Sequence, residues 1–211
     1  FGVAPYGGAN FSGTLFEYDP SNETLTKKAD FESSSLGKYP MGSLLIATNG
    51  NLLGLTSKGG INDSGVLFEY NLSNNTLAKK KEFSSAIGKT PLGSLIQTEN
   101  GLLYGLTSEG GKNNVGSLFQ YDPSKNSLTP YYDFVGAING RSPGGSLVQG
   151  TNGKFYGTTQ YGGITDQGTL YEFDPNTRTI SKKADFNEST SGKYPFGTLH
   201  MASNGKLYGF A

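Results

Sequence analysis

Apolar and polar residues alternate along short stretches of this chain, and no stretch shows the three-to-four-residue spacing of an amphipathic helix. In residues 66–70, for example, Val, Phe and Tyr alternate with Leu and Glu. A period of two places successive side chains on opposite faces of a β-strand. The pattern therefore predicts an all-β protein.

Four such segments follow one another in the second quarter of the chain. Two short apolar runs, 43–48 and 52–57, flank an Asn-Gly pair, which favours a tight hairpin with positive φ at both central residues. The strand at 66–70 follows a Gly-Gly loop, and a turn leads from it into a fourth strand at 76–83. These residues predict four antiparallel strands joined by short connections.

The same pattern occurs four times, so residues 1–211 are predicted to form one repeat domain. Gly-Gly pairs stand at 7–8, 59–60, 110–111 and 162–163, which gives a period of 52, 51 and 52 residues. A unit of this size cannot bury its own apolar face and must stack on its neighbours. Four strands in each repeat of about 52 residues are typical of a propeller blade. We expect a β-propeller of four four-stranded blades.

Lysines along the fourth strand favour the same architecture. They recur at positions 27–28, 79–81 and 182–183, and the third copy has Pro130 instead. Lys and Pro protect an exposed strand edge from pairing with other chains. The fourth strand is therefore predicted to form the outer edge of each blade.

The two ends of the chain leave two arrangements open. Residues 1–4 align with residues 208–211 at the same place in the repeat, and both cannot occupy one strand position. Either the N-terminal strands complete the last of four blades, or the chain is a segment of a larger propeller. We expect the closed four-bladed ring.

Composition excludes several classes of function. The chain has 17 basic and 17 acidic residues, and this zero net charge argues against nucleic-acid binding. It has no cysteine, which excludes disulfides, thiolate metal sites and a cysteine nucleophile. No apolar run approaches the roughly 20 residues that span a bilayer, so we expect no direct membrane insertion.

Three motifs recur in the repeats: Phe followed by Gly-Lys-Tyr-Pro and Leu (186–199), Asn-Gly followed by Gly-Gly (100–111), and Gly followed by Leu-Phe-Glu-Tyr-Asp-Pro (13–20). Together they resemble the GloVer tandem-repeat family of bacterial proteins, over the whole chain. The resemblance implies a propeller-like fold and export to the cell surface or outside. It brings no catalytic residues. The chain differs from the family in lacking an anchor segment, and because it begins at Phe1 rather than Met, we expect a signal or upstream domain to have been removed.

A cation recurs two residues before a proline in the loop that leads from each fourth strand to the next blade. The set is Lys38, Lys89, Arg141 and Lys193. In a closed ring these side chains would share one height and could converge on the axis, where they would attract a carboxylate, sulfate or phosphate. The alternative is that each is a solvated loop charge that recurs because the repeat was duplicated.

Tyrosines stand close to these cations in some copies only. Tyr39 and Tyr194 follow two of the cations, and Tyr6 and Tyr161 precede two of the Gly-Gly pairs. Exposed tyrosines can stack on sugar rings, or they can pack neighbouring loops. The predicted ligand-binding residues are therefore the four cations together with Tyr39 and Tyr194.

The sequence offers no catalytic or metal site, so we expect no enzyme activity, no cofactor and no metal. His200 is the only histidine, and no Ser/His/Asp arrangement can be built on it. The Gly-Gly loops carry too few carboxylates for a calcium shell, and their Asn and Asp favour tight turns. Acids recur before a phenylalanine in every copy, at Asp30, Glu82, Asp133 and Asp185, which indicates a shared structural task such as binding backbone amides of the next loop.

These observations favour a secreted or surface-displayed propeller that serves as a non-catalytic binding module for a glycan or a surface protein. A second hypothesis is a building block or spacer of an extracellular assembly, for which self-association is possible. A third, less favoured, is a polysaccharide-processing enzyme.

Overall fold

The computed structural model describes all 211 residues and contains five antiparallel sheets and one single-turn helix. The first sheet has β1 (Gly2–Ala4), β2 (Thr14–Asp19) and β3 (Thr24–Asp30). The second has β4 (Lys38–Ile46), β5 (Leu52–Lys58), β6 (Val66–Asn71) and β7 (Thr76–Glu82), and the third has β8 (Ile96–Gln97), β9 (Leu103–Thr107), β10 (Ser117–Asp122) and β11 (Ser127–Asp133). The fourth has β12 (Arg141–Pro143), β13 (Val148–Gln149), β14 (Phe155–Tyr161), β15 (Thr169–Asp174) and β16 (Thr179–Asp185), and the fifth has β17 (His200–Met201) and β18 (Leu207–Tyr208).

Strands that follow one another in sequence are neighbours in each sheet, as the sequence predicts, except that β12 and β13 both pair with β14. The lysine-bearing strands β3, β7 and β16 each form an edge of their sheet. The predicted segments 52–57, 66–70 and 76–83 correspond to β5, β6 and β7 within one or two residues at each end. The one helix, α1 (Gly136–Asn139), has four residues, and no helix here is long and apolar enough to cross a membrane.

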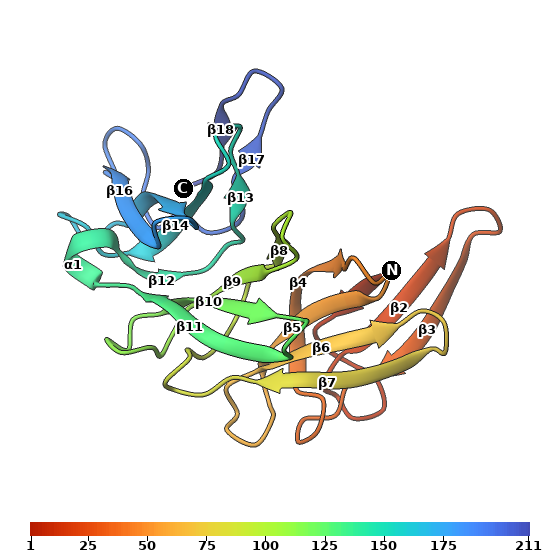
Figure 1. Ribbon diagram of the computed structural model, residues 1–211. Coiled ribbons are helices and arrows are strands. Elements are labelled where there is room, and N and C mark those ends of the chain that lie inside the picture. Colours follow the sequence, from red (N-terminus) through yellow and green to blue (C-terminus); the bar gives the residue numbers. More distant parts are fainter.

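The arrangement of the sheets differs from the expected ring of four four-stranded blades. The four repeats are spread over five sheets, because the chain begins and ends in the second strand of a blade. The three-stranded first sheet and the two-stranded last sheet remain separate. Figure 1 shows the sheets following one another along an arc, with the two termini on different arms.

The Asn-Gly hairpins also differ from the expected two-residue turn. Gly50 has a left-handed backbone (φ 80°), but Asn49 does not. The amide of Gly50 donates to the carbonyl of Ala47 at 2.8 Å, and the amide of Ala47 donates to Asn51 at 2.9 Å. The connection is therefore a three-residue loop that needs positive φ at its glycine alone.

The hydrophobic core lies between consecutive sheets and is built the same way at three junctions. An aromatic residue that follows the outer strand of one sheet meets an aromatic ring from the next-to-last strand of the following sheet, edge to face. The pairs are Phe31–Phe68 and Phe83–Phe119, both with 4.9 Å between ring centroids, and Phe134–Tyr171 at 5.1 Å. All six side chains are fully buried. Such T-shaped pairs add to the stabilisation gained from burying the rings.

The recurring acids hold the Gly-Gly loops, which confirms their structural task. Each carboxylate accepts a hydrogen bond from a loop amide 21 residues earlier in the same repeat. The amide donors are Ala9 to Asp30, Ile61 to Glu82, Lys112 to Asp133 and Ile164 to Asp185, at 2.8–3.2 Å. The loop that each acid binds is the one before it in the chain, rather than the next one.

Candidate functional site

The four predicted cations occupy equivalent positions where each new sheet begins. Lys38 and Arg141 are the first residues of β4 and β12. The residue that follows each cation has a left-handed backbone, with φ between 54° and 57°. Its amide donates across the junction to a loop carbonyl of the preceding sheet, as from Tyr39 to Ser12 and from Tyr194 to Gln167, both at 2.9 Å. The packing of neighbouring sheets therefore fixes where these side chains stand.

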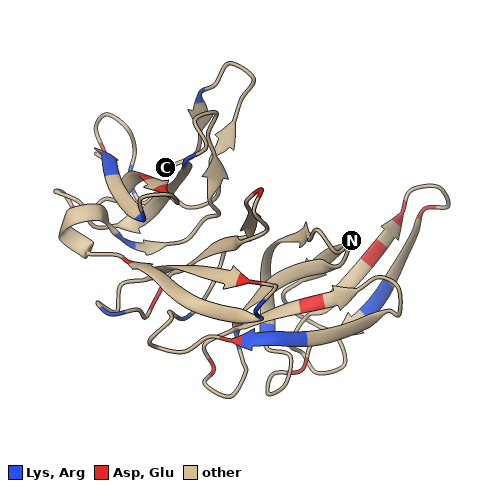
Figure 2. Ribbon diagram, in the orientation of Figure 1, with Lys and Arg blue, Asp and Glu red and all other residues tan.

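Each cation is paired with a carboxylate of its own. The ion pairs are Lys38–Asp63 at 3.3 Å, Lys89–Glu109 at 4.0 Å, Arg141–Asp166 at 2.8 Å, and Lys193–Glu188. Because every positive charge is balanced locally and the arc is open, the cations do not form the convergent ring considered from the sequence. Figure 2 shows acidic and basic residues distributed along the whole arc.

The structure brings the predicted tyrosines together in pairs. Tyr39 lies against Tyr6, with ring centroids 5.5 Å apart, and Tyr194 lies against Tyr161 at 5.3 Å. The two rings of each pair come from neighbouring sheets and are inclined by 56° and 54°. Tyr6 is 74% exposed and Tyr194 is 42% exposed, so both pairs present aromatic surface to the solvent.

Charged groups surround the pair at the later junction, which we call the Tyr161 cluster (Arg141, Tyr161, Asp166, Lys193 and Tyr194). The Arg141 guanidinium lies 4.7 Å from the centroid of the Tyr161 ring and forms two hydrogen bonds with the Asp166 carboxylate, at 2.8 and 3.3 Å. The Lys193 ammonium lies 5.8 Å from the Tyr194 ring centroid. Hydrogen bonds from Arg141 and from the Gly162 amide lower the pKa of Asp166, so this carboxylate is ionised at neutral pH.

The earlier junction has a related group, the Tyr6 cluster (Tyr6, Lys38, Tyr39 and Asp63). The Lys38 ammonium lies 5.7 Å from the centroid of the Tyr39 ring and pairs with Asp63. The amide of Gly59 donates to Asp63 at 2.8 Å. That hydrogen bond, with a further one from Lys38, lowers the pKa of Asp63.

The two middle junctions have no aromatic pair at this position. At one, the Lys58 ammonium donates to the Thr90 hydroxyl at 3.1 Å. At the other, the corresponding residues are Glu109 and Ser142. The backbone arrangement is thus the same at all four junctions, and the side chains at these two positions differ. This difference is expected if only the tyrosine-bearing junctions bind a ligand.

Sequence reasoning missed the carboxylate partners of the cations, although a signal for two of them was present. Lys38 and Asp63 are 25 residues apart, as are Arg141 and Asp166. The two acids had been interpreted as turn formers only, and they do have left-handed backbones, with φ of 47° and 57°. No group of His, Cys, Asp or Glu side chains in the structure is arranged to hold a metal ion.

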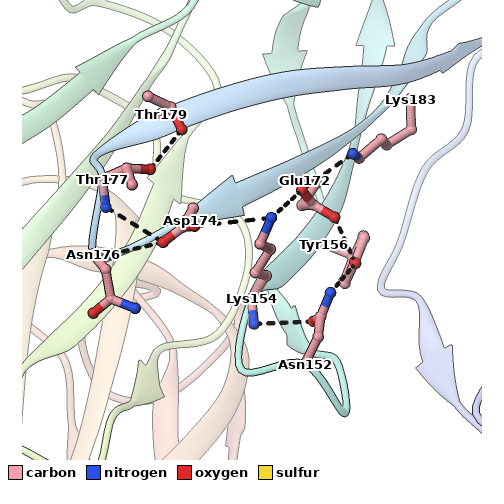
Figure 3. Close-up of polar contacts among 9 residues, drawn as sticks. All are labelled: Asn152, Lys154, Tyr156, Glu172, Asp174, Asn176, Thr177, Thr179 and Lys183. Carbon is pink, nitrogen blue, oxygen red and sulfur yellow. Dashed lines mark hydrogen bonds and ion pairs between the residues drawn. The ribbon is translucent and has the colours of Figure 1, made fainter.

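A second polar network surrounds Glu172 on the fourth sheet (Figure 3). Its carboxylate accepts hydrogen bonds from Lys154 at 2.9 Å and from the Tyr156 hydroxyl at 2.7 Å, and it pairs with Lys183 at 3.1 Å. These partners, Lys154 first, lower the pKa of Glu172 to about 2. Equivalent pairs join β2 to β3 and β6 to β7, namely Glu17–Lys28 at 3.0 Å and Glu69–Lys80 at 2.9 Å. Recurrence across the sheets indicates that Glu172 stabilises the blade rather than forming a separate site.

Comparison with solved structures shows what this fold is similar to. The extracellular domain of the "putative hybrid two component system" of B. thetaiotaomicron matches with a TM-score of 0.66 and 16% identity, over 95% of this chain and 24% of that one. A "putative 6-phosphogluconolactonase" of Bacteroides uniformis matches with a TM-score of 0.62 and 15% identity, over 98% of this chain and 60% of that one. The nidogen/laminin complex matches with a TM-score of 0.59 and 12% identity, over 91% of this chain and 62% of that one.

These neighbours are β-propeller-like, so the similarity shows an all-β, propeller-like fold. It shows the fold alone at such low identities. The chain spans about a quarter of the first neighbour and less than two-thirds of the other two.

No curated protein matches the chain significantly. The Gloeobacter/Verrucomicrobia repeat, in contrast, matches residues 1–211. This match confirms the resemblance drawn from the repeated motifs, and it agrees with the recurring junctions that the structure shows. The chain belongs to the Gloeobacter/Verrucomicrobia repeat family.

Proposed function

We propose that this chain is a non-catalytic binding module of an exported protein, and that it binds a glycan through the Tyr161 and Tyr6 clusters. The observation that carries the proposal is the Tyr161–Tyr194 pair, held at a sheet junction beside an Arg141–Asp166 ion pair. A surface protein is the alternative ligand.

The chemistry of the Tyr161 cluster suits a sugar. A tyrosine ring offers an apolar face for the C–H groups of a pyranose and a hydroxyl at its rim. The Asp166 carboxylate accepts hydrogen bonds from sugar hydroxyls, and the Arg141 guanidinium donates them. Because Arg141 and Asp166 already hold each other, their polar atoms are positioned before the ligand arrives, which lowers the ordering cost of binding.

The Tyr6 cluster provides a second aromatic pair near the other end of the arc. Lys38 lies over Tyr39 there as Lys193 lies over Tyr194, and no arginine accompanies the pair, so this cluster offers a point charge rather than a planar fork. Two related sites on one rigid scaffold raise the apparent affinity for a polymer that reaches both. A polysaccharide with repeated units is therefore the preferred ligand class.

Export is part of the proposal and rests on two supports. Family membership implies it through the resemblance stated from the sequence, and one structural neighbour is an extracellular domain. Enzyme activity is not proposed, although one neighbour carries a lactonase name. A cation recurs at the same place in every repeat and is paired with a carboxylate each time, whereas a catalytic group normally breaks such symmetry.

The test is binding to a printed panel of neutral and acidic oligosaccharides, followed by titration calorimetry on the strongest hit. Tyr194→Ala should weaken binding at least tenfold, because it removes half of the aromatic pair. Ser142→Ala is the matched control, since Ser142 has the same backbone position without a tyrosine, and its affinity should be unchanged. Binding that survives Tyr161→Ala and Tyr6→Ala together would contradict the proposal, as would the absence of any hit.

A further inference from the structure

We infer that the Tyr161 cluster selects uncharged sugars, and that Asp166 determines this selectivity by neutralising Arg141. The inference rests on the proposed glycan binding, to which it adds the class of sugar and the residue that sets it. A polymer of neutral hexoses suits the cluster better than one that carries carboxylates or sulfates.

The charges around the aromatic pair cancel. Arg141 lies 2.8 Å from Asp166, and Lys193 pairs with Glu188, so two cations meet two carboxylates. An anion that approaches either cation must also approach the carboxylate beside it, and the attraction and the repulsion largely offset each other. The surroundings of the aromatic pair therefore offer no net charge to an acidic sugar.

One edge of the Arg141 guanidinium is already occupied. Its Nε and Nη2 atoms donate to the two oxygens of Asp166, at 3.3 and 2.8 Å. Two parallel hydrogen bonds of this kind are what an arginine offers to the carboxylate or sulfate of a ligand. An acidic ligand is left with the far end of the fork, where the charge of Asp166 still acts on it. The remaining N–H groups can each donate to a sugar hydroxyl.

Asp166 is held by its own loop as well as by the arginine. The amide of Gly162 donates to its Oδ1 atom at 2.8 Å, and its backbone is left-handed, with φ of 57°. Asp is one of the residues that adopt this conformation readily. A ligand anion that displaced the carboxylate would therefore break a hydrogen bond within the loop. This fixes the negative charge beside Arg141.

The fold does not require a charge at this position. Asp63 and Asp166 each neutralise a cation that lies over a tyrosine ring. In the repeat between them the cation is followed by Thr90 rather than by tyrosine, and the equivalent residue is Asn114. Asn114 has the same left-handed backbone, with φ of 55°. The carboxylate thus accompanies the exposed tyrosines, and an amide meets the demands of the turn.

The first test compares pairs of short oligosaccharides that differ only in charge. The probes are oligogalacturonate and its methyl ester, hyaluronan fragments and their methyl ester, and dextran oligomers and their sulfate. Calorimetry at low ionic strength should show that the neutral member of a pair binds several times more tightly. Its affinity should change little over about a tenfold range of salt, because no net charge is screened.

The outcomes separate the inference from the proposed function. Tighter binding of the acidic members would overturn the selectivity and leave sugar binding in place. No binding of any probe would overturn the proposed function, and this inference with it.

The second test changes the selectivity with one charge. Asp166→Asn should strengthen binding of the acidic members about tenfold, because Arg141 is no longer neutralised. Binding of the neutral members should weaken severalfold, and added salt should remove the gain for the acidic ones. Arg141→Gln should move the ratio of acidic to neutral affinity in the opposite direction, since the carboxylate held by Gly162 is then unpaired. Asn114 at the equivalent place indicates that the Asp166→Asn variant folds.

Glu109→Gln is the matched control. It removes the carboxylate that pairs with Lys89 at 4.0 Å, at a junction without the tyrosine pair, and it changes the net charge by the same amount. Its ratio of acidic to neutral affinity should equal that of the parent. An equal gain in Glu109→Gln would show that overall charge is responsible, and an unchanged ratio in Asp166→Asn would show that Asp166 does not set the selectivity. Either result would overturn the inference.

Discussion

Gly105 and Phe119 face each other on β9 and β10, so closely that a β-carbon at position 105 would lie less than 3.0 Å from the tip of the phenylalanine ring. The same pairing recurs as Gly54 with Phe68 and as Gly157 with Tyr171. The glycine makes room for the ring that fills each junction. This close approach, rather than a turn, explains a glycine in the middle of a strand.

Gly105→Ala should therefore destabilise the fold by about 1–3 kcal/mol, because the extra methyl overpacks a junction that cannot expand. Urea denaturation followed by tyrosine fluorescence measures the change. Gly136→Ala is the matched control, since its β-carbon would make ordinary contacts of 3.5 Å or more and its φ is not left-handed. It should be neutral or slightly stabilising. Equal losses in both variants would show that the collision at Gly105 is unimportant.

Tyr171→Phe should stabilise the chain by about 1 kcal/mol. The Tyr171 hydroxyl is buried and has no hydrogen-bond partner, so its removal relieves a desolvation cost. Tyr121→Phe is the contrasting variant, because the Tyr121 hydroxyl donates to Asn126 at 3.0 Å. That change should cost about 0.5–1.5 kcal/mol. The melting temperatures of the two variants should move in opposite directions.

Acid should weaken the fold through Glu172. Its folded-state pKa, about 2, lies below the ordinary value of a glutamate, so the unfolded chain binds the proton more tightly. The stabilisation is present in full above about pH 5 and is lost as the pH falls toward 2. Glu172→Gln should be less stable than the parent at pH 7, and this difference should shrink by pH 3. The third repeat already has Gln120 at this place, so the variant should fold. Parallel denaturation curves at the two pH values check the prediction, and a difference independent of pH would contradict it.

Asp166→Asn should separate binding from stability. The Arg141–Asp166 pair is largely exposed, so its loss should cost less than about 1 kcal/mol of stability, and the amide oxygen can still accept from Gly162. Binding of the glycan should weaken severalfold, because the site loses its charged acceptor and the arginine loses its orientation. Calorimetric affinity and melting temperature, measured on the same preparation, distinguish the two effects. An unchanged affinity would remove Asp166 from the site.

The sequence by itself determined the strands, their order and their outer edges. These features depend on local physics: the alternation of residues 66–70, the glycines of the turns and the lysines of β7 act over a few residues. The acid at position 30 could also be assigned a structural task, because it recurs in every copy.

Only the tertiary structure decided which side chains meet across the junctions and whether the ring closes. Tyr161 and Tyr194 are 33 residues apart and belong to different sheets, so no local period brings them together. Closure depends on how each sheet packs on the next, and these packing contacts join residues that lie far apart in the sequence. Repeats with the same sequence pattern can therefore form an arc or a ring, and the packing between the sheets determines which.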